Sequence, residues 1–200
     1  KKKRRKKGRK QRRKNISVKS TTLSYIGHNK NNDRFDNDFY ATPFEATESL
    51  LKVESFDGKI YEPCCGQGHI SKVLIKHGYD VESTDLVDRG YGQSHIDFLM
   101  ETTVRDNIIT NPPYGKLLIQ FLNHTQLIAD KKICLLLKLQ ALEGIARGEF
   151  YKTCPPVRVH VFSKRVSLMK NGDSYDGGMM ALAWFVWEKG NKSKPLVSWL

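Results

Sequence analysis

The sequence has no long apolar stretch. None of its hydrophobic runs reaches the roughly 20 residues of a membrane-spanning helix, and its basic start is not followed by the apolar core of a signal peptide. We therefore expect a cytoplasmic protein that does not contact a membrane. The sequence also shows no internal repeat. Its 200 residues, 39% of them hydrophobic, predict one domain with a substantial core.

Cysteine is scarce, and its spacing is not that of a zinc site. The four cysteines form no Cys-x-x-Cys pair, and no histidine follows them at a zinc-binding distance. In the cytoplasm such thiols stay reduced. Cys64 and Cys65 are adjacent, which would suit a redox role, but small residues that fill a turn are a simpler explanation. We expect no metal in this protein.

Acidic residues are absent from the start of the chain. The whole sequence has 34 Lys and Arg against 21 Asp and Glu, a net charge of +13, and residues 1–14 contain twelve of the positive charges. Without them the net charge is 13 − 12 = +1. We therefore expect a disordered basic arm over residues 1–14, a polar linker over 15–38 and a nearly neutral folded domain over 39–200.

The arm also lacks aromatic residues, so it would contribute charge rather than base stacking. Three interpretations of it stay open: non-specific contact with phosphates, a nuclear-type address, and an artificial addition, since the sequence begins without methionine. The predicted function does not depend on the arm.

Asn111-Pro112-Pro113-Tyr114 is the most informative motif. It follows the apolar residues 107–110, which predict a buried strand, and α/β enzymes bind ligands where such strands end. The two prolines stiffen the backbone. The Asn111 oxygen and the Pro112 carbonyl can then accept both N–H groups of a planar amine while Tyr114 stacks on its ring. A stiff strand exit with a packing tyrosine is the structural alternative.

A glycine loop lies upstream of this motif. A short strand over residues 59–61 is followed by Glu62-Pro63-Cys64-Cys65-Gly66-Gln67-Gly68, and then by a helical pattern of apolar residues from Ile70 to Ile75. Gly66 and Gly68 allow a tight turn and the close approach of a ligand to the backbone. The spacing is neither GxGxxG nor a phosphate loop, so the motif alone also fits an ordinary strand-to-helix turn.

Together the two motifs resemble those of S-adenosylmethionine-dependent amino-methyltransferases. Glu-Pro-x-x-Gly-x-Gly followed by Asn-Pro-Pro-Tyr is similar to the small DNA adenine-N6 methyltransferases of phages, and the resemblance extends over about residues 39–188. Tyr40-Ala41-Thr42-Pro43 precedes both motifs and resembles that family's N-terminal cofactor motif. The same residues also fit a helix start, with a capping box of Thr42 and Glu45 and with Pro43 at the first helical position.

The resemblance implies a class I methyltransferase fold. This Rossmann-like α/β fold has three layers and a mostly parallel seven-stranded sheet that ends in an antiparallel hairpin. The apolar stripe from Leu117 to Ile128 predicts a helix after the Asn-Pro-Pro-Tyr loop. Strands are expected over residues 59–61, 80–85, 95–98, 106–110, 132–137, 157–161 and 181–187, with a glycine-rich loop over 171–178.

The resemblance also implies S-adenosylmethionine as the cofactor. Asp85 would accept the ribose hydroxyls, Asp97 and Phe98 would bind the adenine with Asp88 as an alternative, and Glu62 would contact the methionine end. Turn or helix-cap roles are the competing explanation for these aspartates. The predicted cofactor-binding residues are Tyr40, Thr42, Glu62, Pro63, Gly66, Gly68, Asp85, Asp97 and Phe98, and the predicted catalytic residues are Asn111, Pro112, Pro113 and Tyr114.

The implied reaction is direct transfer of a methyl group to adenine N6 in DNA, with the base flipped out of the duplex. RNA is the alternative partner, methylated at adenine N6 or guanine N2, because the same motif serves those enzymes. A catalytically inactive nucleic-acid-binding relative is a further alternative. Little chain follows Trp187, so we expect no separate target-recognition domain and base reading by loops at 90–94 and 170–178.

Overall fold

The computed structural model describes residues 40–166, 169–170, 173–174, 180–191 and 193–200. The chain divides into two units, Lys1–Asp38 and Phe39–Leu200, and all the described residues belong to the second. The predicted basic arm and linker therefore lie outside the described residues, as does most of the predicted loop over 171–178. No helix of the described part is long and apolar enough to cross a membrane.

A central sheet organises the described residues. Its strands are β2 (Ile60–Glu62), β3 (Val81–Ser83), β4 (Arg105–Thr110), β5 (Ala129–Lys138), β6 (Arg158–Val161), β9 (Leu182–Glu188) and β10 (Leu196–Trp199). They form the seven-stranded order β10-β6-β9-β5-β4-β2-β3. β9 is antiparallel to β5 and β6, and the other neighbours are parallel. This confirms the predicted mostly parallel sheet with an antiparallel C-terminal pair.

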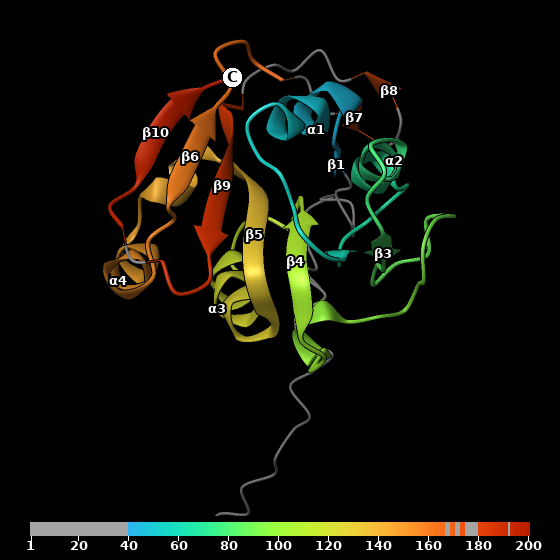
Figure 1. The fold of residues 1–200 in the computed structure, drawn as a ribbon, viewed down its shortest axis with the longest axis horizontal. Helices are drawn as coiled ribbons and strands as arrows, with labels where there is room; N and C mark the ends of the chain where they lie inside the picture. Colours follow the sequence, from blue (N-terminus) through green and yellow to red (C-terminus); the bar gives the residue numbers. More distant parts are fainter. Residues whose placement is uncertain (1–39, 167–168, 171–172, 175–179, 192) are drawn as a thin grey trace, which may run out of the picture. The chain divides into compact units, whose positions relative to one another are not determined.

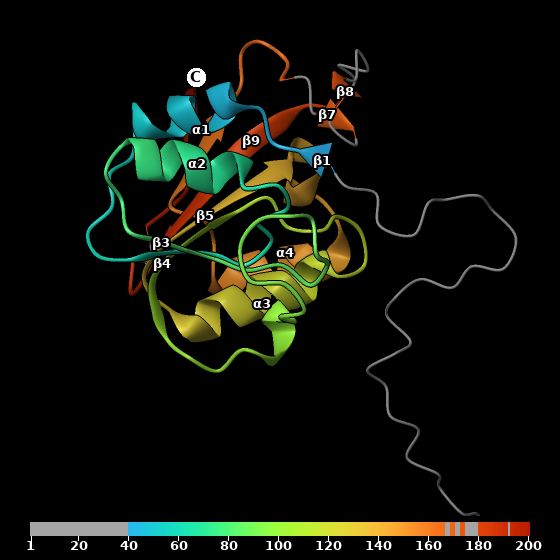
Figure 2. The ribbon, with the colours of Figure 1, turned by 90° about the vertical axis from the view of Figure 1, so that its right-hand side faces the viewer.

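Helices cover both faces of the sheet (Figures 1 and 2). The helices α1 (Phe44–Leu51) and α2 (His69–Lys76) pack on one face, and α3 (Leu118–Ile128) and α4 (Ile145–Thr153) lie on the other. A separate small sheet contains β1 (Tyr40–Ala41), β7 (Met169–Lys170) and β8 (Asp173–Ser174). The predicted three-layer α/β architecture is therefore present.

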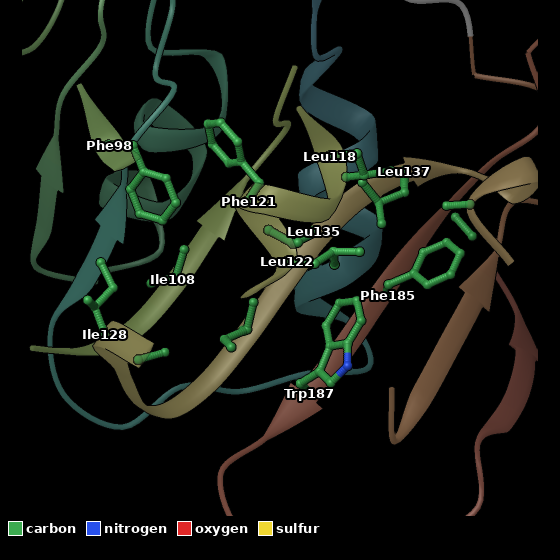
Figure 3. Close-up of a cluster of buried hydrophobic side chains, with 14 of the residues drawn as sticks. Phe98, Ile108, Leu118, Phe121, Leu122, Ile128, Leu135, Leu137, Phe185 and Trp187 are labelled. Carbon is green, nitrogen blue, oxygen red and sulfur yellow. The ribbon is translucent and has the colours of Figure 1, made fainter. Parts of the chain in front are cut away.

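Alternating side chains along the strands form two cores. Ile108 and Leu135 face α3 and pack with Phe121 and Phe185 in one cluster (Figure 3). Their chain neighbours Ile109 and Leu136 face α1 and α2 in the other cluster. Strands that bury both faces in this way show continuous apolar sequence, as parallel sheets do.

The predicted strand over residues 95–98 is not formed. His95 has a left-handed backbone with φ 62°, and the Asp97 side chain accepts a hydrogen bond from the Leu99 amide and caps a 3-10 helix at Phe98–Met100. Both features break an extended chain. The seventh strand is instead β10, near the C-terminus of the chain. It is the outermost strand of the sheet and pairs in parallel with β6.

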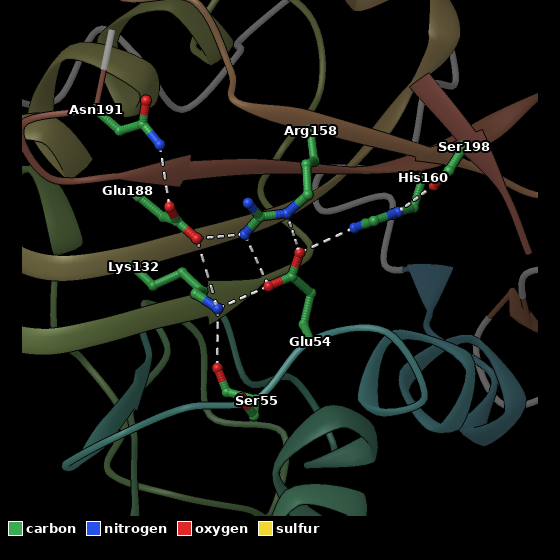
Figure 4. A network of polar contacts seen from close by, with 8 residues as sticks. All are labelled: Glu54, Ser55, Lys132, Arg158, His160, Glu188, Asn191 and Ser198. Carbon is green, nitrogen blue, oxygen red and sulfur yellow. Dashed lines mark hydrogen bonds and ion pairs between the residues drawn. The ribbon is translucent and has the colours of Figure 1, made fainter. Parts of the chain in front are cut away.

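A network of ion pairs and hydrogen bonds connects residues near the amino ends of strands β5 and β6 (Figure 4). Glu54, whose side chain is 2% exposed, accepts hydrogen bonds from Lys132 at 2.7 Å, from His160 at 3.0 Å and from two nitrogens of Arg158. Arg158 also pairs with Glu188. The network joins the loop after α1 to β5, β6 and β9, and the sequence patterns did not predict it.

Candidate active site

Four strand ends lie side by side at one edge of the sheet. β5, β4, β2 and β3 are consecutive neighbours and parallel, so their carboxyl ends meet at the same edge. The residues there are Lys138, Asn111, Glu62 with the glycine loop, and Asp85. Ligand sites of open α/β sheets form outside this edge. The structure therefore brings the two predicted motifs together.

The Asn111 side chain is the best-connected group at this edge. Its amide nitrogen Nδ2 donates to the carbonyl oxygen of Tyr40 at 3.2 Å and to Thr42 Oγ1 at 3.1 Å. Its oxygen Oδ1 accepts a hydrogen bond of 2.8 Å from the Tyr114 hydroxyl. Within the described part of the chain, no hydrogen bond uses the Pro112 carbonyl, the second acceptor predicted from the sequence.

Tyr114 packs against both core clusters, and its hydroxyl points to Asn111. Burial raises the pKa of this phenol, so it stays protonated and remains a donor. Lys138 Nζ lies 5.0 Å from the centre of the Tyr114 ring, a cation–π contact. In this conformation the Tyr114 hydroxyl is hydrogen-bonded to Asn111 Oδ1, the atom that was predicted to accept a hydrogen bond from the substrate amine.

Thr42 does not cap the following helix. The capping box predicted for Thr42 and Glu45 is wrong: α1 begins at Phe44 after Pro43, and no side chain caps it. The Thr42 hydroxyl instead accepts from Asn111, 69 positions further along the chain. Thr42 is 4% exposed, so this bond satisfies a buried polar group.

Glu62 is a buried carboxyl group without a charged partner among the described residues. It is 1% exposed, and its Oε2 accepts from the Ser71 amide at 2.9 Å and from the Ser71 hydroxyl. Ser71 Oγ in turn lies 2.6 Å from Ser83 Oγ. Burial, with a smaller effect from the charge of Asp85, raises the pKa of Glu62 to about 8 although the Ser71 bonds lower it. A cationic amine beside Glu62 would favour the ionised form of this carboxyl group and could form an ion pair with it.

The glycine loop and Asp85 form one unit. Gly66 and Gly68 have left-handed backbones, with φ 54° and φ 78°. The Gly66 amide donates to Asp85 Oδ2 at 2.8 Å, and the Val87 amide donates to Oδ1 at 2.9 Å. Asp85 thus lies two residues after β3, with its carboxylate held against the loop that follows β2. Each carboxylate oxygen keeps a further lone pair for a ligand hydroxyl.

The Tyr91 ring covers the place where a side chain at residue 68 would lie. A Cβ atom at Gly68 would lie 2.4 Å from Cδ1 of the Tyr91 ring. Tyr91 belongs to the insert of residues 86–94, which returns to β3 through the hydrogen bond from the Gln93 amide to the Ser83 carbonyl at 2.9 Å. The ring is also within 5.1 Å of Lys72 Nζ. Tyr91 is not among the site residues predicted from the sequence, although its flanking residues Gly90 and Gly92 signal a special loop.

The two residues predicted to bind adenine follow Ile96, whose amide donates to the Asp85 carbonyl at 3.1 Å. Asp97 caps the 3-10 helix through the Leu99 amide at 3.0 Å. Phe98 is 2% exposed, and its ring centroid is 4.9 Å from that of Phe121 in the core. Asp88, the alternative, is exposed and accepts from the Gly90 amide at 3.0 Å. As they lie, Asp97 and Asp88 serve turns and Phe98 serves the core.

The cysteines at the site are not activated. Burial, with smaller effects from the nearby carboxyl groups Glu62 and Asp85, raises the pKa of Cys65 to about 12, and burial also raises the pKa of Cys64. Both thiols are therefore protonated and poor nucleophiles. In the described part of the chain, no group of three or more His, Cys, Asp or Glu is placed to hold a metal ion.

No protein-family model matches the sequence, and no curated protein matches it significantly. Solved structures do resemble it. A candidate RNA methyltransferase from Pyrococcus horikoshii has a TM-score of 0.57 at 16% identity, over 75% of this chain and 86% of that one. Magnesium protoporphyrin IX methyltransferase from Synechocystis, with bound S-adenosylmethionine, has a TM-score of 0.53 at 12% identity, over 74% of this chain and 79% of that one.

The modification subunit of a candidate type I restriction enzyme from Vibrio vulnificus has a TM-score of 0.54 at 11% identity. The match covers 81% of this chain and 50% of that protein, so the chain spans about half its length. The chain has the class I methyltransferase fold. At these identities the likeness establishes the fold, and the site residues are judged on their own geometry.

Proposed function

We propose that this chain is an S-adenosylmethionine-dependent methyltransferase that acts on the exocyclic N6 amine of adenine in DNA. The observation that supports this most is the Asn111 amide, which is held at the end of β4 beside Tyr114 and next to the glycine loop of β2. An oriented amide oxygen beside an aromatic ring suits an amine attached to a planar ring.

The glycine-loop side fits the cofactor. The buried Glu62 could form an ion pair with the cationic amino group of the cofactor. Asp85 retains lone pairs for the ribose hydroxyls, and the left-handed glycines turn the loop toward the strand ends. When bound, S-adenosylmethionine supplies a methyl group on a positively charged sulfur. The protein's own task is then to align the amine and to exclude water. For the cofactor adenine we favour the insert that contains Tyr91 over the core residue Phe98.

The substrate amine would replace the Tyr114 hydroxyl on Asn111 Oδ1. The amine nitrogen donates one N–H there, which leaves its lone pair free for the methyl group, and the Pro112 carbonyl is the proposed acceptor for the other N–H. Tyr114 would then stack on a base flipped out of the duplex. Residues 39–200 form the proposed catalytic domain.

The test is incubation of the protein with radiolabelled S-adenosylmethionine and, separately, duplex DNA, RNA and a protein mixture, followed by digestion to nucleosides and amino acids. We expect label in N6-methyladenine from DNA. An RNA base is the second candidate, favoured by the likeness to the candidate RNA methyltransferase, and label in N6-methyladenine or N2-methylguanine from RNA would select it. If none of the three substrates is labelled, the proposal is contradicted, whether or not the protein binds S-adenosylmethionine.

A further inference from the structure

The direction of the Asn111 amide is fixed by its neighbours. A backbone carbonyl oxygen can only accept hydrogen bonds, so the atom 3.2 Å from the Tyr40 oxygen must be the NH2 group. The other end of the amide, Oδ1, therefore faces the Tyr114 hydroxyl at 2.8 Å. Reversal of the amide would set two acceptors against each other at Tyr40.

The segment that holds the amide is itself anchored on both sides. Before Thr42, Ala41 is 1% exposed and pairs with Met169 of β7. After it, α1 is fastened to the central sheet by a 2.9 Å hydrogen bond from Trp184 Nε1 to the Ala46 carbonyl. Thr42 is thus a buried hydroxyl on a fixed backbone, which is what a group that orients another side chain requires.

We propose that Thr42 is a positioning residue for methyl transfer, which turns Asn111 Oδ1 toward the substrate amine. This inference rests on the proposed function. A hydroxyl accepts through its lone pairs and keeps one proton to donate. A hydroxyl that served the cofactor, the role predicted from the sequence, would change cofactor binding when removed, whereas a hydroxyl that orients Asn111 would change turnover.

The test compares Thr42→Val, which removes the hydroxyl at constant shape, with Thr42→Ser, which keeps it. Thr47→Val is the matched control, because Thr47 is fully buried on the adjacent helix and its Oγ1 has no hydrogen-bond partner among the described residues. Cofactor affinity is measured by calorimetry, turnover with the methyl acceptor identified above, and the Asn111 side-chain amide by NMR of ¹⁵N-labelled protein.

We expect Thr42→Val to lower kcat about tenfold, the loss of one good hydrogen bond, while the cofactor Kd changes by less than about twofold. The Asn111 NH2 resonances should shift in Thr42→Val. Thr42→Ser, which keeps the hydroxyl, should retain most of the turnover that Thr42→Val loses and show a smaller shift of the Asn111 NH2 resonances, and Thr47→Val should match the parent protein in all three measurements. If Thr42→Val does not fold, the same fall in kcat and the same shift of the Asn111 NH2 resonances are expected in Thr42→Ala, which is measured instead.

Two results would overturn the inference. One is a Thr42→Val protein with unchanged kcat and a weakened cofactor Kd, which would make Thr42 a cofactor ligand alone. The other is an unshifted Asn111 amide. Failure of the proposed function is recognised separately: in that case Asn111→Ala keeps full turnover or the parent protein transfers no methyl group, whereas the NMR comparison still reports on the hydrogen bond.

Discussion

At the residue scale, the Tyr114 hydroxyl and the proposed substrate amine compete for the same oxygen atom of Asn111. The hydroxyl donates to Asn111 Oδ1 at 2.8 Å and lies 3.5 Å from the Leu136 carbonyl. The ring is therefore turned inward, toward the core, in this conformation. In the proposed reaction, binding of a base would require this bond to break and the ring to turn toward the base.

This competition predicts opposite effects for two substitutions. Tyr114→Phe keeps the ring and removes the competing donor, so KM for the methyl acceptor should fall by about three- to tenfold, the equivalent of one hydrogen bond. Tyr114→Ala removes the stacking surface, so kcat/KM should fall by at least about tenfold. Steady-state kinetics with the acceptor distinguishes them. Equal losses in both variants would show that the hydroxyl itself is needed.

Glu62 gives the folded protein a pH dependence of its own. Its pKa is about 8 in the folded protein and 4.5 as the ordinary value, so the folded state binds a proton that the unfolded state lacks between these values. Its contribution to stability is fully present below 4.5 and is lost as the pH rises through about 8.

Glu62→Gln should therefore gain stability relative to the parent protein as the pH rises. We expect melting temperatures that are similar at about pH 5 and that differ by several degrees, in favour of the variant, at about pH 9. Differential scanning calorimetry measures this. Ser71→Ala is a useful companion, since it removes a hydrogen bond that lowers the same pKa. Parallel curves for Glu62→Gln and the parent protein would contradict the assigned pKa.

At the scale of elements, the glycine loop and the insert of residues 86–94 form a joint unit. Gly68 lies under the Tyr91 ring, and Gly66 is bonded to Asp85 at the base of the insert. A side chain at position 68 would meet both steric crowding by the ring and the strain of a left-handed backbone.

A double-mutant cycle separates these two costs. Gly68→Ala should destabilise the protein by both, whereas in a Tyr91→Ala background only the left-handed strain of about 1–2 kcal/mol should remain. Urea unfolding should therefore give a coupling energy above about 1 kcal/mol between the two positions. Gly78→Ala is the control, because Gly78 also has positive φ but no atom within 4 Å of its Cβ direction. Additive effects at positions 68 and 91 would contradict the contact.

The elements also show what local sequence can and cannot predict. The strands β4 and β5 and the helix α3 follow from continuous or periodic apolar residues, because burial of those residues alone determines them. The segment 95–98 has a strand-like composition, but the left-handed His95 and the cap made by Asp97 decide its path. Such choices depend on the neighbouring loop rather than on the pattern.

Thr42 illustrates the same limit at the site. A threonine followed by proline and, three positions after the threonine, by glutamate satisfies the local rule for a helix cap. Its hydroxyl is used instead by Asn111, which is distant in sequence and adjacent in space. The motifs thus predicted which segments meet, whereas the hydrogen bonds between them required the fold.

At the scale of the whole molecule, the Glu54 ion network and the proposed active site lie at opposite ends of the sheet's strands. The Glu54 network occupies the amino ends of β5 and β6, and Asn111, Glu62 and Asp85 occupy the carboxyl edge. Burial alone would raise the pKa of Glu54, but hydrogen bonds from His160, Arg158 and Lys132 lower it to about 2.

This network predicts resistance to acid. The stabilisation by Glu54 is present above its ordinary pKa of 4.5 and is lost as the pH falls through about 2. Glu54→Gln should cost about 3 kcal/mol at neutral pH, because it leaves the partly buried Arg158 and Lys132 with Glu188 as their one remaining carboxylate among the described residues, and should flatten the acid limb of the stability curve. Glu188→Gln, at the more exposed end, should cost less. Urea unfolding across the acid range tests this, and a neutral effect of Glu54→Gln would refute it.

In the proposed reaction Asn111 orients the substrate amine for methyl transfer, while the glycine loop binds the cofactor. The most direct measurement is the cofactor Kd, by calorimetry, and methyl transfer in Asn111→Ala, with Asn123→Ala on the exposed face of α3 as the control. We predict that Asn111→Ala binds S-adenosylmethionine within about threefold of the parent protein and that its methyl transfer falls at least about a hundredfold. Methyl transfer by Asn111→Ala at the rate of the parent protein would contradict the account.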